Sequence, residues 1–267
     1  MRLRLSATVT SQGSLLLAEL QSAKPLADLR ADWSGQEVEF WRPDARAEDR
    51  RALLGVDLGR PRGKYQVKVW AEAGGAPVSC TAGVTVRAGK FATERLQVQP
   101  KYVEPIPEEI KRAEEERDRL RALFAKVTPE RLWQGRFRVP LDGVSAGGNF
   151  GRRRILNGQP GSPHSGMDFP APAGTPVHAA QRGRVVLAEE FFFSGNTVVI
   201  DHGLGIYTFY GHLSSIRAKA GDLIEAGAIL GESGATGRVT GPHLHWGLTV
   251  NRARVNPLEI VALLGKE

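Results

Sequence analysis

Short segments in which apolar and polar residues alternate recur through most of this chain, and they constrain its fold more than any other feature. In "KYQVKVW", residues 64–70, the alternation puts Tyr65, Val67 and Val69 on one face and polar side chains on the other. Such a pattern is typical of an antiparallel strand with one face in solvent. Gly, Pro and Asp residues separate the segments. The sequence therefore predicts a mainly β protein.

The chain divides into three regions. Residues 1–100 carry several short strand segments, which predict an N-terminal β-sandwich of immunoglobulin-like size. Residues 101–135 include "PEEIKRAEEERDRLRALF", a run of strong helix formers that predicts one linker helix, beginning after Pro107 and stopped near Pro129. Residues 136–267 are rich in glycine and β-branched residues, and they predict a compact antiparallel β domain.

Composition excludes several classes of protein. The chain has 267 residues, of which 41% are hydrophobic, and no apolar run approaches the roughly 20 residues of a transmembrane helix. Its single cysteine, Cys80, rules out an internal disulfide framework and a zinc site built of several thiolates. The start of the chain is interrupted by Ser and Thr where a secretory signal would be continuously apolar, so we expect a first strand there.

The charge is basic, with 36 Lys and Arg against 29 Asp and Glu, a formal net charge of +7. A basic protein is attracted to anionic surfaces, which leaves nucleic acid or an anionic cell envelope as candidate partners. Only "GRRRILNG", residues 151–158, clusters three arginines, without aromatic residues between them. We therefore expect no specific nucleic-acid partner.

The histidines are distributed unevenly, because all six lie in the C-terminal region: His164, His178, His202, His212, His243 and His245. In "GPHLHWGL", His243 and His245 are two residues apart on a predicted strand, so both project from one face. That arrangement suits either packing or a shared site.

A carboxylate strengthens the second interpretation. "PHSGMDF" places His164 four residues before Asp168, in a stretch where Pro163 and Gly166 disfavour a regular helix. Two histidines and one carboxylate form a known three-ligand set for catalytic zinc, with the fourth position left to water. "YGHL" adds His212, which taken alone favours a core histidine.

These motifs, in this order, resemble those of the lysostaphin and LytM type of zinc metalloendopeptidase, which cuts peptidoglycan peptides. The resemblance covers residues 136–260 and is carried by "HSGMD", "HGLGIYTFYGHL" and "GAILGESGATGRVTGPHLHWGL". "GNFGRRRILNG" is also similar to the arginine-containing lead-in of that family. The N-terminal region looks like the accessory domain of some exported members.

The resemblance implies particular roles for five residues. His164, Asp168 and His245 become the ligands of Zn²⁺, while His212 and His243 become the catalytic pair that handles protons beside a metal-bound water. Which of the two histidines is the base and which stabilises the oxyanion stays open. Some members carry a tyrosine just before the first ligand, but none of the four tyrosines here precedes His164 closely.

The remaining polar candidates have weaker patterns. Arg152, Arg153 and Tyr210 are predicted to contact substrate, although a solvated basic loop explains the arginines equally well. His178 and His202 are interpreted as structural or solvent-facing residues.

These features favour an exported zinc endopeptidase that hydrolyses peptide stems or cross-bridges of peptidoglycan at the cell wall, in the periplasm or outside the cell. Its signal peptide is expected to be absent from this sequence. The alternative is a catalytically silent module that binds the wall or activates other hydrolases. Filled ligand positions argue against that alternative.

Overall fold

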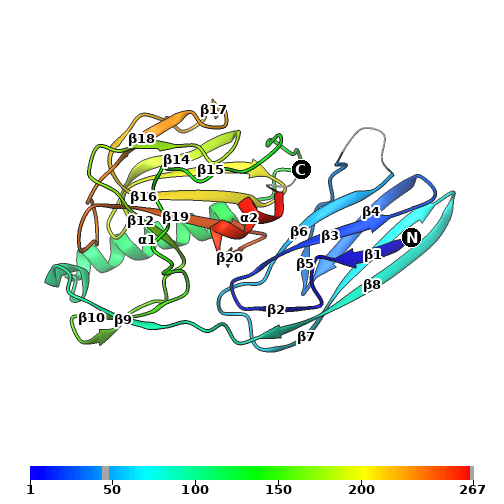
Figure 1. Ribbon diagram of the computed structural model, residues 1–267, viewed down its shortest axis with the longest axis horizontal. Coiled ribbons are helices and arrows are strands. Elements are labelled where there is room, and N and C mark those ends of the chain that lie inside the picture. The colour runs from blue at the N-terminus through cyan, green and yellow to red at the C-terminus, as the bar shows by residue number, and fades with distance from the viewer. Residues whose placement is uncertain (44–47, 265–267) are drawn as a thin grey trace.

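A computed structural model describes residues 1–43 and 48–264. The protein is mainly β, as predicted, and its strands form an N-terminal group and a C-terminal group that lie beside each other (Figure 1). The predicted ranges 1–100 and 136–267 include the positions outside the described residues. Division of the chain into domains at these boundaries stays a prediction.

The N-terminal strands form two sheets that enclose one apolar core. Buried side chains of β3 (Leu15–Gln21), β6 (Arg50–Gly55), β7 (Gly63–Ala73) and β8 (Ala76–Arg87) meet in that core, and Trp33 lies among them with 1% of its surface exposed. Val67 and Val69 are fully buried while Gln66 and Lys68 face solvent, which confirms the alternation read in this strand. The immunoglobulin-like interpretation stays a prediction. The first sheet has the order β1 (Arg2–Leu5), β3 (Leu15–Gln21), β6 (Arg50–Gly55); the second has the order β2 (Val9–Ser11), β8 (Ala76–Arg87), β7 (Gly63–Ala73), β4 (Leu26–Trp33), β5 (Gln36–Glu37).

The C-terminal strands form a large antiparallel sheet with short strands at its margins. Its strands bury one face almost completely, since Leu244, Trp246 and Leu248 of the last long strand are at most 1% exposed. The main order is β12 (Gly166–Pro170), β19 (His243–Val250), β16 (Ile206–Ile216), β15 (Gly195–Gly203), β14 (Gly183–Phe191), β17 (Leu223–Ile224); β13 (Pro176–His178) pairs with β18 (Ile229–Ser233), which pairs with β16, and β20 (Ala253–Val255) pairs with β19.

The helices differ slightly from expectation. Helix α1 (Pro107–Phe124) begins at Pro107 itself, where the missing N–H is not needed for helical hydrogen bonding, and it ends at Phe124, before Pro129. Its Leu120, Leu123 and Phe124 pack against an apolar cluster on β14, β15 and β16. A short 3₁₀ helix covers Pro100–Tyr102, and α2 covers Pro257–Leu264. Among the helices of the described ranges, none is long and apolar enough to cross a bilayer.

The two groups of strands contact each other directly. Leu15, Trp41 and Leu53 of the N-terminal group belong to the main apolar cluster of the C-terminal group. Arg254 Nη2 lies 2.9 Å from Asp57 Oδ1 across this contact. The two groups therefore share buried surface and an ion pair.

A small fourth sheet joins distant parts of the chain. Strand β9 (Thr93–Leu96) pairs in parallel with β10 (Arg153–Leu156), which pairs with β11 (Gln159–Pro160). In Figure 1, β9 and β10 lie together at the lower left, beyond the long connection from the N-terminal sheets. Residues near 94 are thereby placed beside the segment that leads into β12.

The buried His202 generates a prediction about stability. Its Nδ1 donates to the Arg182 carbonyl at 2.9 Å, its Nε2 lies 2.7 Å from Thr208 Oγ1, and burial lowers the pKa of His202 to about 4. An unfolded histidine titrates near pH 6.5, so acidification from about pH 6.5 to about pH 4 protonates the unfolded chain first and destabilises the fold. We expect His202→Gln to be less stable at neutral pH but to lose less stability over this window. Thermal unfolding of both proteins at about pH 7.5 and pH 5 tests this, and an equal loss in both would contradict it.

Candidate metal centre

Pairing of β12 with β19 builds the centre of the site. In this antiparallel pair Asp168 lies directly opposite His245, so their side chains project from the same face. The Asp168 Oδ1 atom is 2.9 Å from His245 Nδ1 and 3.0 Å from His164 Nε2, and the two imidazole nitrogens are 2.9 Å apart. Within the described residues, these three form the one group whose donor atoms could hold a metal ion together.

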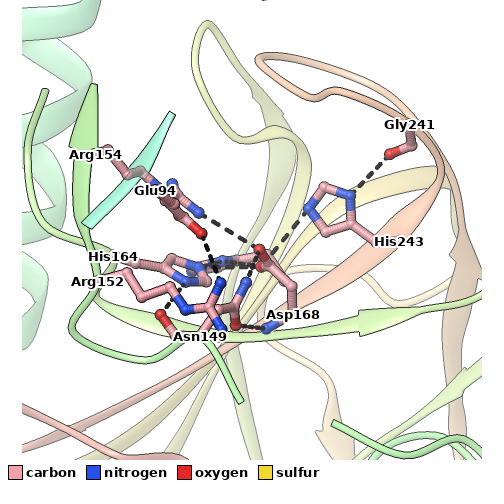
Figure 2. Close-up of polar contacts among 9 residues, drawn as sticks. Glu94, Asn149, Arg152, Arg154, His164, Asp168, Gly241 and His243 are labelled. Atoms are coloured by element: carbon pink, nitrogen blue, oxygen red, sulfur yellow. Dashed lines mark hydrogen bonds and ion pairs between the residues drawn. The ribbon is translucent and has the colours of Figure 1, made fainter. Parts of the chain in front are cut away.

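His164 lies in the loop before β12 and is held by the backbone of the loop before β10. Its side chain is 1% exposed, and its Nδ1 lies 3.0 Å from the Asn149 carbonyl oxygen. A carbonyl can only accept, so Nδ1 donates this hydrogen bond, and in the neutral tautomer the lone pair of Nε2 points toward Asp168. Figure 2 shows His164 between Asn149 and the carboxylate.

The donor chemistry fits a small cation. A carboxylate oxygen and an imidazole lone pair are both acceptors, and two acceptors in contact repel each other unless a proton or a cation lies between them. Two nitrogens and one oxygen are a ligand set that zinc accepts, and tetrahedral zinc separates its ligand atoms by roughly 3.4 Å. The observed triangle, with sides of 2.9, 2.9 and 3.0 Å, needs to widen by only a few tenths of an ångström.

The carboxylate stays ionised in this setting. Burial alone would raise the pKa of Asp168, but its close contacts with His164 and His245 outweigh that effect and hold the pKa of Asp168 well below its usual range. Burial also lowers the pKa of His245 to about 4, against the opposing contact with Asp168. An anionic carboxylate beside neutral imidazoles is the protonation state that metal binding requires.

Two further histidines lie beside the triangle. His243 Nδ1 donates to the Gly241 carbonyl at 2.8 Å, and its Nε2 is 3.6 Å from Asp168 Oδ1 (Figure 2). His212 Nδ1 donates to the Thr236 carbonyl at 2.8 Å, and the ring centroid of His212 is 4.8 Å from that of His243. In both rings the hydrogen bond to the backbone is made by Nδ1 and not by Nε2.

The backbone at His212 adopts an uncommon conformation. Its φ is +63°, in the left-handed region, and β16 shifts register against β18 just beyond it. Burial first, then the neighbouring His245 and His243, lower the pKa of His212 to about 3. Such strained backbone concentrates at functional sites.

Behind the triangle, the other carboxylate oxygen of Asp168 has partners of its own. Asp168 Oδ2 accepts from Asn149 Nδ2 at 2.7 Å and lies 3.4 Å from Arg154 Nη2. Glu94 Oε1 in turn accepts from Arg154 Nε at 2.9 Å. Neither Asn149 nor Glu94 was singled out as a site residue from the sequence, whereas Arg154 belongs to the arginine cluster for which substrate contact and a solvated loop were both considered. The arginine-containing lead-in was the available signal, and nothing pointed to Glu94.

The predicted substrate contacts fall in different places. Arg152 Nη1 is 3.4 Å from Glu94 Oε2 at the edge of the site, and Arg153 is exposed. Tyr210 is fully buried, and its hydroxyl accepts from Ala180 N at 2.8 Å. The expected substrate contact of Tyr210 is therefore wrong, because the side chain lies on the core face of β16.

The remaining histidines are away from the triangle. His178 Nδ1 donates to the Gly227 carbonyl at 2.9 Å, and His202 is fully buried in hydrogen bonds. These contacts agree with the structural interpretation of both residues. Tyr102, the tyrosine nearest before His164, packs against Phe192.

A glycine makes room for one of the three candidate ligands. A Cβ atom on Gly166 would lie 2.6 Å from His245 Cε1 and Nε2 and 2.7 Å from the Trp246 carbonyl oxygen. Ordinary carbon contacts are about 3.5–4.0 Å. Only glycine at this position leaves room for the His245 ring so close to β12, within reach of Asp168.

Comparison with known proteins gives this geometry a context. The model of peptidase family M23 matches residues 162–257. Peptidoglycan DD-endopeptidase ShyA of Vibrio cholerae is 47% identical over 98 residues, which are 37% of this chain and 23% of that protein. DD-carboxypeptidase/endopeptidase Mpg of Neisseria meningitidis is 40% identical over 97 residues, 36% of this chain and 22% of that protein. The chain thus matches about a quarter of the length of these curated relatives.

One solved structure is similar over nearly the whole chain. A crystal structure from Pseudomonas aeruginosa, described as a peptidase M23, has 31% sequence identity and a TM-score of 0.71 and covers 94% of each chain. The match includes the N-terminal sheets as well as the region of the candidate metal site. Together with the family model, this similarity shows that the chain belongs to peptidase family M23.

Proposed function

We propose that this protein is a zinc-dependent endopeptidase that hydrolyses peptide bonds in the stems or cross-bridges of bacterial peptidoglycan. The observation that carries the proposal is the convergence of His164, Asp168 and His245, with donor atoms 2.9–3.0 Å apart beside two further histidines. Relatives named as peptidoglycan DD-endopeptidases support the substrate class. Stem and cross-bridge peptides are alternatives that digestion products distinguish.

His164, Asp168 and His245 would hold the ion, each through one donor atom. When bound, zinc supplies a Lewis acid that polarises the scissile carbonyl and acidifies water. The protein prepares this site by keeping Asp168 ionised and by using the Asn149 carbonyl to orient His164. Oriented ligands lose little freedom when the ion binds.

Proton transfer falls to the two histidines outside the ligand set. His212 and His243 each donate Nδ1–H to a backbone carbonyl, so the neutral rings offer the lone pair of Nε2. An imidazole so placed can take up a proton from the attacking water or, once protonated, donate a hydrogen bond to the developing oxyanion. We assign the two roles to the pair jointly.

The charge of the molecule suits an anionic cell envelope. A formal net charge of +7 favours encounter with such a surface; Arg152 lies beside Glu94 at the edge of the site, and Arg153 is exposed. We propose that these arginines contact carboxylates of the peptide, and that the protein acts outside the cytoplasm. A silent wall-binding module is the less favoured alternative, because none of the three ligand positions is missing.

The direct test measures metal content and activity together. Purified protein is analysed for zinc, and isolated peptidoglycan sacculi are digested with and without a chelator. We expect one zinc ion per chain and release of peptide fragments that the chelator abolishes. Mass spectrometry of the fragments identifies the bond cut. Stoichiometric zinc without fragments would favour the silent alternative, and absence of zinc binding would overturn the proposal.

Exchange of single histidines separates the ligands from the proton-transfer pair. His245→Ala should lose zinc and activity together, whereas His243→Ala should keep zinc and lose roughly 10²–10⁴-fold in rate. His178→Ala is the matched control, because His178 also donates to a backbone carbonyl but lies outside the site. Zinc content and kcat of the three variants are the measurements. Equal loss of zinc from His243→Ala and His245→Ala would show that the roles are misassigned.

A methyl group at position 166 should disturb the site without removing a ligand. Gly166→Ala places a Cβ 2.6 Å from the His245 ring, so we expect weaker zinc binding in a chelator competition. Gly83→Ala is the control, since the nearest atom to its added Cβ is 3.9 Å away. Zinc affinity equal to that of the unmodified protein in Gly166→Ala would mean that the ring tolerates displacement.

A further inference from the structure

A second layer of charged groups lies behind the candidate metal ligands. Asp168 uses Oδ1 toward the histidines and Oδ2 toward Asn149 and Arg154, at 2.7 and 3.4 Å. Arg154 is itself shared, because its Nε donates to Glu94 at 2.9 Å. Figure 2 shows Glu94 and Arg154 on adjacent strands above the Asp168 carboxylate.

Glu94 comes from a distant part of the sequence. It lies on β9, in parallel register with β10, where Glu94 is the direct partner of Arg154. Its side chain is 13% exposed and also lies 3.4 Å from Arg152 Nη1. Glu94 is thus enclosed by two guanidinium groups, and it precedes the region matched by the family model, residues 162–257.

The contacts of β9 keep Glu94 in place from both sides. Asn157 exchanges two hydrogen bonds of 2.9 Å with the backbone of Val98, and Arg153 N donates to the Ala92 carbonyl at 2.9 Å. At the start of the strand, Phe91 packs on Gly151, where an added Cβ would lie 2.2 Å from the ring. These contacts hold the Glu94 carboxylate at a fixed distance from β10.

We propose that Glu94 is a positioning residue for the metal centre: it orients Arg154, and Arg154 holds Asp168 so that Oδ1 faces the histidines. The inference rests on the proposed zinc site. Without Glu94, Arg154 loses the anchor at its Nε and leaves an excess positive charge beside the site. Both changes weaken cation binding, and loss of an outer partner of a metal ligand typically lowers affinity 10–100-fold.

Zinc affinity of the full chain tests this role. Competition with a chromophoric chelator gives the Kd for zinc of the unmodified protein and of Glu94→Gln, and thermal unfolding checks that each is folded. We expect a 10–100-fold higher Kd for Glu94→Gln. Glu94→Asp, which keeps the charge but shortens the reach, replaces it if the Gln variant does not fold, and it should also bind more weakly. An unchanged Kd, with tight binding by the unmodified protein, overturns this inference alone. Absence of zinc binding by the unmodified protein overturns the proposed function as well.

The control removes an ion pair of the same kind elsewhere. Asp57 and Arg254 form an ion pair between the N-terminal strands and β20 of the C-terminal sheet, with Nη2 and Oδ1 at 2.9 Å. Asp57→Asn should lower thermal stability and leave the Kd for zinc unchanged. If Asp57→Asn weakens zinc binding as much as Glu94→Gln does, a general structural role replaces the positioning role.

Two further measurements separate positioning from long-range charge. An electrostatic effect acting through solvent is screened in roughly 1 M salt, whereas a misplaced carboxylate is not corrected by salt. We therefore expect most of the loss in Glu94→Gln to persist at high salt. If Glu94 acts through Arg154, adding Glu94→Gln to Arg154→Gln should cost little more than Arg154→Gln alone. Full additivity, or recovery of affinity at high salt, would overturn the proposal.

Discussion

The candidate site depends above all on the register between β12 and β19. Asp168 faces His245 across this pair, and Pro170 faces His243 two residues further along. Side chains of a strand alternate between faces, so a slip of one residue would turn both histidines toward the core. The opposite face prevents such a slip, because Met167, Phe169, Leu244 and Trp246 are at most 3% exposed. The apolar core thus fixes the geometry of the polar site.

Backbone carbonyls then determine the state of the histidines. Asn149, Thr236 and Gly241 each accept from the Nδ1 of one histidine, at 2.8–3.0 Å. Each hydrogen bond selects one tautomer and limits rotation of the ring. The three carbonyls belong to loops, which explains why the surrounding sequence is rich in glycine and turn residues. The conformation of these loops therefore determines which imidazole nitrogen carries the proton and how each ring is oriented.

The candidate metal ligands were identified from the sequence better than the residues that hold those ligands in place. A His-x-His pair on a strand and an ordered set of motifs pointed to His164, Asp168 and His245, which the fold brings together. Glu94 could not be found in this way, because its contact with Arg154 spans 60 residues and depends on a parallel pairing of two short strands. The prediction that Tyr210 contacts substrate was wrong for a different reason. It is adjacent to the predicted site strand but lies opposite Trp246 on the buried face, which the register shows and the motif does not.

The residues that surround Asp168 on the side away from the histidines lie outside the region matched by the family model. The matched residues 162–257 contain the three candidate ligands and the two further histidines, but Asn149, Arg154 and Glu94 all precede them. A buried carboxylate with one oxygen left unpaired would be free to turn, and its desolvation would be uncompensated. Asp168 avoids this because both of its oxygens have partners. Arg154, a partner of Oδ2, is itself contacted by Glu94 on β9, the strand that follows the N-terminal sheets. Those sheets also contact the C-terminal sheet through buried apolar side chains. Strand β9 therefore connects a segment outside the matched region to the surroundings of Asp168, and removing it would take away the Glu94 partner of Arg154.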